Sequence, residues 1–145
     1  MVIRALKFND ISALVSIAKA SMPHPWNEVA FRDCLKPNYS SWVLLVNDEL
    51  IGFIIILQHE SECELMNLAI KPEYQRKGYA KLLLQHAIDF MKSKGVARLL
   101  LEVRRSNHVA IQFYKKMGGQ QIGLRKNYYP LGKQREDALI FSLNV

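Results

Sequence analysis

The sequence contains few of the residues that hold small disulfide-rich or metal-bound proteins together. It has only two cysteines, Cys34 and Cys63, without CxxC spacing, and its four histidines are scattered rather than grouped with acidic residues. Both features argue against a disulfide framework and against a structural metal site. We therefore expect no metal cofactor, and we expect the two cysteines to be small, buried apolar residues.

Long apolar runs are also missing. The longest run, FIIIL at residues 53–57, is far too short to cross a bilayer, and the first ten residues lack the apolar segment of a signal peptide. Half of the 145 residues are apolar and 23% are charged, without low-complexity tracts or an obvious linker. We expect one globular domain over residues 1–145, located in the cytoplasm and without a membrane partner.

Positive charge is in excess, with a net charge of +7. Such an excess predicts attraction to an anion, which can be nucleic acid, anionic lipid or a phosphorylated cofactor. The sequence has no long Lys/Arg run and no basic motif interleaved with aromatic residues. Direct binding of nucleic acid is therefore not required to explain the charge.

Hydrophobic spacing predicts an alternation of helices and strands. The predicted helices are residues 8–22, 27–35, 78–95 and 106–119, and the predicted strands are residues 41–46, 50–58, 62–70, 97–103, 120–125 and 137–145. The first two strands are joined by a short polar turn, which favours a hairpin. Strand 62–70, the helix after it and strand 97–103 form a strand–helix–strand unit, which is expected to be parallel. This order indicates an α/β or α+β fold with a mixed sheet.

Helix starts and one helix face can be predicted in more detail. Asn9 or Asp10 is expected to cap the first helix, and Asn27 opens the second. The last helix is expected to begin at a capping Ser106 or Asn107. Four of its residues are expected to face the core: Val109, Ala110, Phe113 and Met117.

The start of helix 78–95 has no Ser, Thr or Asp to accept its free N–H groups. Its sequence, QRKGYA, instead offers Gly78 together with Arg76, Lys77 and Lys81. Free N–H groups, the helix dipole and three cations suit a phosphate or pyrophosphate, and a glycine allows close approach of the backbone. A solvated basic turn with a structural glycine fits the local pattern equally well. GxGxxG and GK[ST] are both absent, which sets aside two nucleotide-binding classes.

The segment LMNLAIKPEYQRKGYAKLLLQHAI resembles the acetyl-coenzyme-A signature of the GNAT N-acetyltransferases, Q/R-x-x-G-x-G/A, with Gln75, Gly78 and Ala80 at its defining positions. The segments PHPWNEVAF, LLLEVRRSNHVAIQFYKKMG and NYYPLGKQREDALIF extend the similarity over nearly the whole chain. They resemble the group within the family that acetylates the N-terminal alanine of a ribosomal protein. The resemblance implies a mixed, largely antiparallel central sheet of six to seven strands flanked by about four helices.

The resemblance also implies where acetyl-coenzyme A would bind. Backbone groups of one strand would pair with the pantetheine arm, and the pyrophosphate would lie on the start of the following helix. These expected cofactor-binding residues are Leu68, Ala69, Ile70, Arg76, Lys77, Gly78, Tyr79, Ala80 and Lys81, with Asn107 and Tyr114 on the last helix. From local sequence alone, Asn107 fits a helix cap equally well.

The resemblance implies two catalytic side chains. Glu102, a polar residue within LLLEV, matches the position of the general base, and Tyr114 matches the general acid that protonates the departing thiolate. Taken by the residues alone, Glu102 could pair with Arg104 or face water, and Tyr114 could be a half-buried core aromatic. Tyr128 and Tyr129 could form an aromatic loop over the acceptor, or one of them could pack on the last strands.

The activity implied is transfer of acetyl from acetyl-coenzyme A to the N-terminal amine of a protein, with a small-subunit ribosomal protein beginning in alanine as the acceptor. Two alternatives stay open: an acetyltransferase of a small amine such as a polyamine or antibiotic, and a non-catalytic acyl-coenzyme-A-binding module. One departure from the family is Gly119, where an aromatic residue is usual. We expect it to loosen packing on the far side of the coenzyme.

Overall fold

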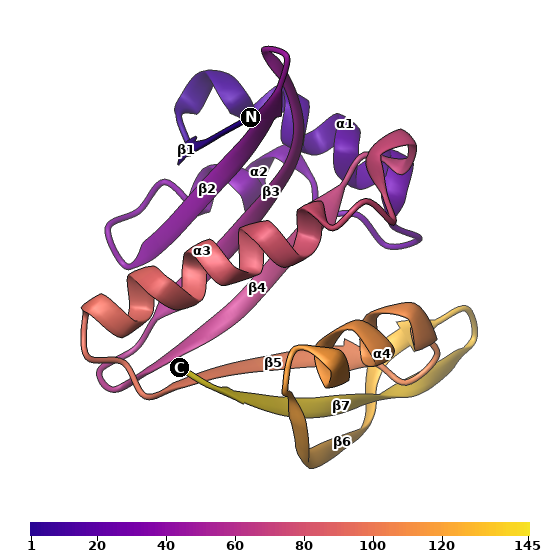
Figure 1. The fold of residues 1–145 in the computed structure, drawn as a ribbon. Helices are drawn as coiled ribbons and strands as arrows, with labels where there is room; N and C mark the ends of the chain where they lie inside the picture. Colours follow the sequence, from indigo (N-terminus) through magenta and orange to yellow (C-terminus); the bar gives the residue numbers. More distant parts are fainter.

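A computed structural model describes all 145 residues. The chain forms one mixed sheet with helices on both faces (Figure 1). The strands are β1 Val2–Ala5, β2 Tyr39–Val46, β3 Glu49–Gln58, β4 Glu62–Ile70, β5 Arg98–Arg104, β6 Gln120–Leu131 and β7 Gln134–Asn144, and the helices are α1 Ile11–Ser21, α2 Glu28–Asp33, α3 Tyr79–Ser93 and α4 His108–Lys116. The sheet order is β1-β2-β3-β4-β5-β7-β6, and only β4 and β5 are parallel. The mixed, largely antiparallel sheet is confirmed, whereas β1 was not predicted.

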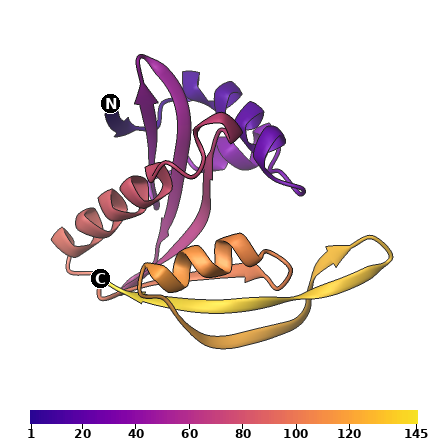
Figure 2. The ribbon, with the colours of Figure 1, turned by 45° about the vertical axis from the view of Figure 1, so that its right-hand side comes forward.

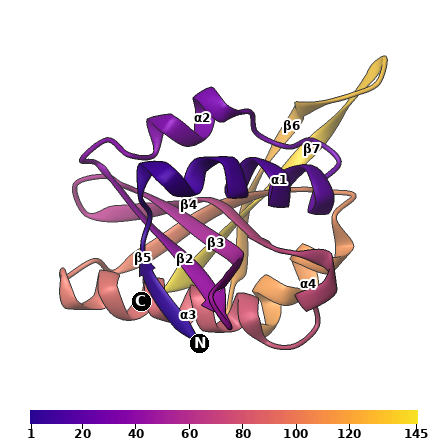
Figure 3. The same cartoon turned by 90° about the horizontal axis from the view of Figure 1, so that it is seen from above.

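The helices form two layers. Figure 3 shows α1 and α2 on one side of the sheet and α3 and α4 on the other, with the tip of the β6–β7 hairpin extending on the side of α1 and α2. Each layer has its own core: α1 and α2 pack on Val43, Phe53 and Ile55, while α3 packs on the opposite face. Strands β2 and β3 are therefore covered on both faces, which explains their nearly continuous apolar sequences. No helix is both long and apolar enough to cross a membrane.

Helix α3 lies as its spacing predicted. Its buried residues are Leu83, Leu84, Ala87 and Met91, and Gly95, which follows it, adopts a positive φ of 75°. Glycine favours this left-handed conformation because it has no Cβ to collide with the backbone. Asn27 also caps α2 as expected, since its side chain accepts a hydrogen bond from the backbone N–H of Ala30 at 2.9 Å.

The predicted cap of α1 is wrong in detail. The carboxylate of Asp10 accepts two hydrogen bonds from the Arg4 guanidinium, at 2.8 and 3.0 Å, and one from the Lys7 N–H at 2.8 Å, but makes no cap bond to α1. The Arg4 guanidinium holds the pKa of Asp10 below its usual value. Asp10 therefore ties β1 to the start of α1.

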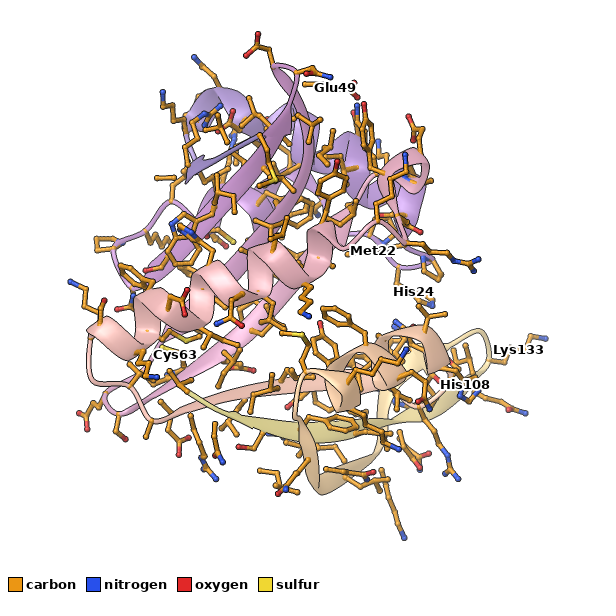
Figure 4. All side chains as sticks on the ribbon, viewed as in Figure 1. Met22, His24, Glu49, Cys63, His108 and Lys133 are labelled. Atoms are coloured by element: carbon orange, nitrogen blue, oxygen red, sulfur yellow. The ribbon has the colours of Figure 1, made fainter.

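The sheet splits between β4 and β5. These strands pair only from Glu62–Arg98 to Leu65–Leu101. Directly after Leu65, the pairing of β4 with its other neighbour, β3, shifts by one residue, which makes Met66 a β-bulge. Figures 1 and 2 show the two halves of the sheet diverging from there like a V. In Figure 4, Cys63 lies at the closed end, while His24 and His108 lie at the open end, on the α1–α2 connection and at the start of α4.

Two predictions near the end of the chain are corrected. Val109 is 79% exposed and Ile111 is buried instead, because the run Val109–Ile111 is apolar throughout and only packing decides which residue of α4 faces inward. Tyr128 and Tyr129 lie in β6 rather than in a loop. Tyr129 pairs with Glu136 of β7, so the hairpin continues past the predicted end of the strand.

Candidate active site

The loop before α3 holds the start of that helix in an unusual conformation. The Gln75 side chain donates to the carbonyl of Ile70 at 2.9 Å, which anchors the loop to the end of β4. Arg76 and Gly78 then adopt positive φ values of 62° and 87°. Gly78 is the N-cap residue and offers no side chain to the helix. The signature glutamine thus has a structural role in forming the turn.

The backbone N–H groups of residues 76–81 donate to no acceptor in the protein. Arg76, Lys77 and Lys81 surround them and form no ion pairs, although the Lys77 ammonium lies 5.7 Å from the centre of the Tyr74 ring. A Cβ placed on Gly78 would meet no atom within 4 Å, so the space beside this residue is open. Free donors, a helix dipole and formal positive charge together form a site that suits a diphosphate.

The end of β4 has one unpaired edge. Leu68, Ala69 and Ile70 pair with β3 on one side, but they lie beyond the last β4–β5 pair on the other. An extended ligand can add to such an edge as a further strand would, through main-chain hydrogen bonds. This edge ends at the loop that leads into α3, so a single extended molecule could follow both.

Tyr114 lies on α4, half-buried and in edge contact with Phe113, with ring centres 5.2 Å apart. Its hydroxyl makes no hydrogen bond within the protein, and burial raises its pKa well above the ordinary value for tyrosine. The group therefore keeps its proton at physiological pH. Asn107 caps α4 by accepting from the N–H of Ala110 at 3.2 Å. Its contact with a coenzyme stays a prediction.

Gly119 packs closely against the end of α4, and its effect on the far side of the coenzyme stays a prediction. Its N–H donates to the carbonyl of Tyr114 at 2.8 Å. A Cβ at this position would lie 2.8 Å from the same carbonyl oxygen and 3.3 Å from Leu143 of β7. A larger residue would therefore push β7 and the end of α4 apart. The glycine allows close contact between the helix that carries Tyr114 and the sheet.

Glu102 is the first β5 residue beyond the paired segment of β4, at the vertex of the V. Its neighbours Leu101 and Val103 pack in the core under α3, so the alternation of the strand places Glu102 on the opposite face. Its carboxylate pairs with Arg125 Nε at 2.9 Å. The predicted alternative partner, Arg104, instead binds Glu136 at 2.9 Å.

Two tyrosines lie beside this carboxylate. The Arg104 guanidinium lies 4.4 Å from the centre of the Tyr129 ring, and that of Arg125 lies 5.3 Å from the centre of the Tyr128 ring. Burial, together with the nearby charge of Glu102, raises the pKa of Tyr129 to about 12. We call these five residues the Glu102 strip: Glu102, Arg104, Arg125, Tyr128 and Tyr129.

Sequence reasoning missed two residues near the vertex. Asn67 is a buried polar residue on β4, one position past the bulge, and it shares a face with Ala69, which packs in the core under α1. A lone asparagine in an apolar strand was a usable signal. Arg125 had no such signal, because β6 is separated from β5 by β7 and its contact with Glu102 depends on the sheet order.

A cavity of about 360 Å³ lies elsewhere, between the end of β5 and the first residues of β7, close to the turn of the β6–β7 hairpin. It contains none of the predicted site residues and no apolar side chain, and two of its acids are held in ion pairs with Arg104 and Arg105. Its lining residues are Arg105, Ser106, His108, Arg135, Glu136 and Asp137. We therefore place the candidate active site in the V between β4 and β5 rather than in this cavity.

Comparisons with known proteins agree with this architecture. Residues 11–119 match the model of the acetyltransferase (GNAT) family. The chain is 37% identical over 143 residues to the [ribosomal protein bS18]-alanine N-acetyltransferase of Escherichia coli K12, covering 99% of this chain and 97% of that protein. It is 35% identical over 145 residues to a putative [ribosomal protein bS18]-alanine N-acetyltransferase of Bacillus subtilis, covering 99% and 95%. The crystal structure of the Escherichia coli ribosomal-protein-S18-alanine N-acetyltransferase superimposes with a TM-score of 0.93, covering 99% of this chain and 93% of that one.

Proposed function

The chain belongs to the acetyltransferase (GNAT) family, and on that premise we propose that it transfers acetyl from acetyl-coenzyme A to the N-terminal amine of a protein, with the N-terminal alanine of a small-subunit ribosomal protein as acceptor. Full-length relatives that carry the name of this activity support the choice of acceptor. We propose further that Glu102 and Tyr114 carry the proton transfers.

The observation that carries the proposal is the two-sided V between β4 and β5. One side offers the unpaired edge of β4 and the free N–H groups before α3, which suit a long phosphorylated thioester. The opposite face holds the carboxylate of Glu102 at the vertex, flanked by Tyr128 and Tyr129. A donor and an acceptor could thus approach the same point from opposite faces, without competing for space.

Acetyl-coenzyme A would supply the activated acetyl group. The residues present fit it: the N–H groups of residues 76–81 would take the diphosphate, with Arg76, Lys77 and Lys81 nearby, and Leu68, Ala69 and Ile70 would pair with the pantetheine arm. The same open edge of β4 could present an N–H to the acetyl oxygen, where negative charge develops. Asn107 and Tyr114 would line the other wall from α4.

The acceptor must lose a proton before it can attack. At about pH 7.5, roughly a third of an α-amine with pKa near 7.8 is already neutral, against about 0.1% of a lysine side chain. A single carboxylate at the vertex can therefore suffice as the base for an N-terminal substrate. The ammonium loses its first proton to solvent. Glu102 would then take the second proton from the nitrogen, directly or through water, as the neutral amine bonds to the acetyl carbon, and would release it to solvent afterwards.

The carbon–sulfur bond then breaks, and the electron pair leaves with sulfur. Tyr114 would donate its hydroxyl proton to this thiolate, and solvent would return the proton to the tyrosine afterwards. Its hydroxyl is protonated at physiological pH and has no hydrogen-bond partner in the protein to give up. It is therefore available as a donor in each turnover.

The acceptor assignment is tested with a panel of acceptors and acetyl-coenzyme A, read by mass spectrometry. The panel contains a peptide beginning with alanine, the same peptide with an internal lysine and a blocked N-terminus, and a polyamine. We expect the mass to increase by one acetyl group on the free N-terminus. Modification of lysine alone would refute N-terminal acetylation, and preference for the polyamine would support a small-amine acetyltransferase.

The catalytic assignment is tested with Glu102→Gln, against Glu64→Gln on β4 as a matched control on the same face of the sheet. We expect Glu102→Gln to lower kcat by about 10²-fold or more, as removal of a positioned base commonly does, while binding of acetyl-coenzyme A is retained. Glu64→Gln should behave as the wild type. A wild-type protein that binds the coenzyme without turnover would instead indicate a non-catalytic binding module.

A further inference from the structure

The exposed side chain of Arg125 pairs with the carboxylate of Glu102. We propose that its guanidinium takes, in the protein without acceptor, the position that the acceptor's ammonium group takes in the complex. Arg125 would then be displaced whenever an acceptor binds, and it would set the affinity for amines. This inference rests on the proposed function, because it takes the Glu102 strip as the acceptor's side of the V.

The contacts of Arg125 describe a cation site. Its Nε lies 2.9 Å from Glu102 Oε1, and its guanidinium carbon lies 5.3 Å from the centre of the Tyr128 ring. A carboxylate on one side and an aromatic face on the other is an arrangement that binds an organic cation of either kind, guanidinium or ammonium. The amine to be acetylated carries this charge and has to reach this carboxylate.

Arg125 and Arg104 lie on the same face of the sheet, but only one of them is firmly held. Arg104 is 19% exposed and is held by the carboxylate of Glu136, by the carbonyl of Pro130 and by the Tyr129 ring. Arg125 is 55% exposed, and its one ion pair, to Glu102, is the only polar bond of its side chain. Exposed pairs of this kind contribute little, so Arg125 can leave at small cost, whereas Arg104 fixes the ring next to it.

Two cations cannot share the site without repelling each other. An ammonium at the carboxylate would lie within a few ångström of the guanidinium, where like charges are unfavourable even with solvent nearby. Binding of an amine therefore requires Arg125 to swing toward solvent. A neutral ligand, such as the acetylated product, does not compete for the carboxylate and does not require this movement.

The test is the affinity of two peptides, measured by calorimetry so that it does not depend on turnover. One peptide begins with a free alanine amine, and the other is the same peptide acetylated at its N-terminus. Arg125→Met removes the charge but keeps an unbranched side chain. Lys126→Met removes one charge from the next residue of β6, which forms no ion pair, and serves as the matched control. Arg125→Lys keeps the competing charge.

We expect Arg125→Met to bind the free-amine peptide about two- to fivefold more tightly than the wild type, since this is the range that an exposed ion pair contributes to an equilibrium constant. The acetylated peptide should bind with unchanged affinity. Lys126→Met and Arg125→Lys should resemble the wild type for both peptides.

Unchanged or weaker binding of the free amine by Arg125→Met would overturn the inference. So would equal tightening for both peptides, which would make Arg125 a steric obstacle rather than a competing charge. The proposed function fails separately. The wild type could fail to acetylate any N-terminus while Arg125→Met still binds the free-amine peptide, but not the acetylated peptide, more tightly. In that case the competition between Arg125 and an amine for Glu102 is supported, and the proposed reaction is refuted.

Discussion

Replacing Gly78 by alanine separates what this glycine does for the fold from what it does for a ligand. Gly78 has φ 87°, and an added Cβ would meet no protein atom within 4 Å. The cost of the substitution is therefore conformational, about 1–2 kcal/mol for a side chain in the left-handed region. Reduced freedom of the unfolded chain offsets about 0.4–1 kcal/mol of it. The net loss of about 1 kcal/mol corresponds to a fall in Tm of roughly 2–4 °C for a chain of this size.

Gly95→Ala provides the control at the other end of α3. Gly95 has φ 75°, and its Cβ would likewise meet nothing within 4 Å, so the conformational cost should be similar. Only Gly78 lies among the N–H groups proposed to hold the diphosphate, so only there would an added methyl group lie next to that ligand. Loss of one hydrogen bond to a charged group costs about 1.5–3 kcal/mol, which is about 10- to 100-fold in affinity.

The assay is release of the coenzyme's free thiol at varied acetyl-coenzyme A, together with a thermal melt of each variant. We expect both alanine variants to melt a few degrees lower, and only Gly78→Ala to raise the KM for acetyl-coenzyme A by about tenfold or more. The reasoning is refuted if both variants raise this KM equally, or if neither does, because the start of α3 would then have no special role in binding.

Three further predictions concern catalysis, packing and acid stability. Tyr114→Phe should lower kcat by about 10²-fold with little change in Tm, because the hydroxyl has no partner in the protein; unaltered turnover would remove Tyr114 from the mechanism. Gly119→Ala should lower the free energy of unfolding in urea by about 1–3 kcal/mol, because its Cβ would lie 2.8 Å from the Tyr114 carbonyl oxygen; a variant as stable as the wild type would contradict the close contact. The pKa of Asp10 is lower in the folded protein than in the unfolded chain, so its stabilising effect is complete above the ordinary aspartate pKa and is lost as the pH falls through the lower folded value. The measurement is the urea midpoint of unfolding as a function of pH. Asp10→Asn and Arg4→Met should both reduce the fall of this midpoint at acidic pH. An unchanged fall would show that the ion pair does not contribute to stability.

Helix α3 and the β2–β3 hairpin show what could be predicted locally. The spacing of Leu83, Leu84, Ala87 and Met91 marks the buried face of a helix long enough to establish its own period, and Gly95 marks its end. The polar turn between β2 and β3 forms because Asn47 and Asp48 tolerate positive φ, here 51° and 64°. The absence of a cap before α3 was equally local, and the structure shows the free N–H groups that this absence implied.

The sequence by itself determined these elements, the parallel β4–α3–β5 unit and the family's signature, because each depends on residues close together in the chain. Only the tertiary structure decided the bulge at Met66 that opens the V, the inward face of α4 and the pairing of Glu102 with Arg125. These features depend on contacts between strands that are distant in sequence, above all on the insertion of β7 between β5 and β6. A short apolar run is compatible with several such arrangements, and only the packing of the whole sheet selects one.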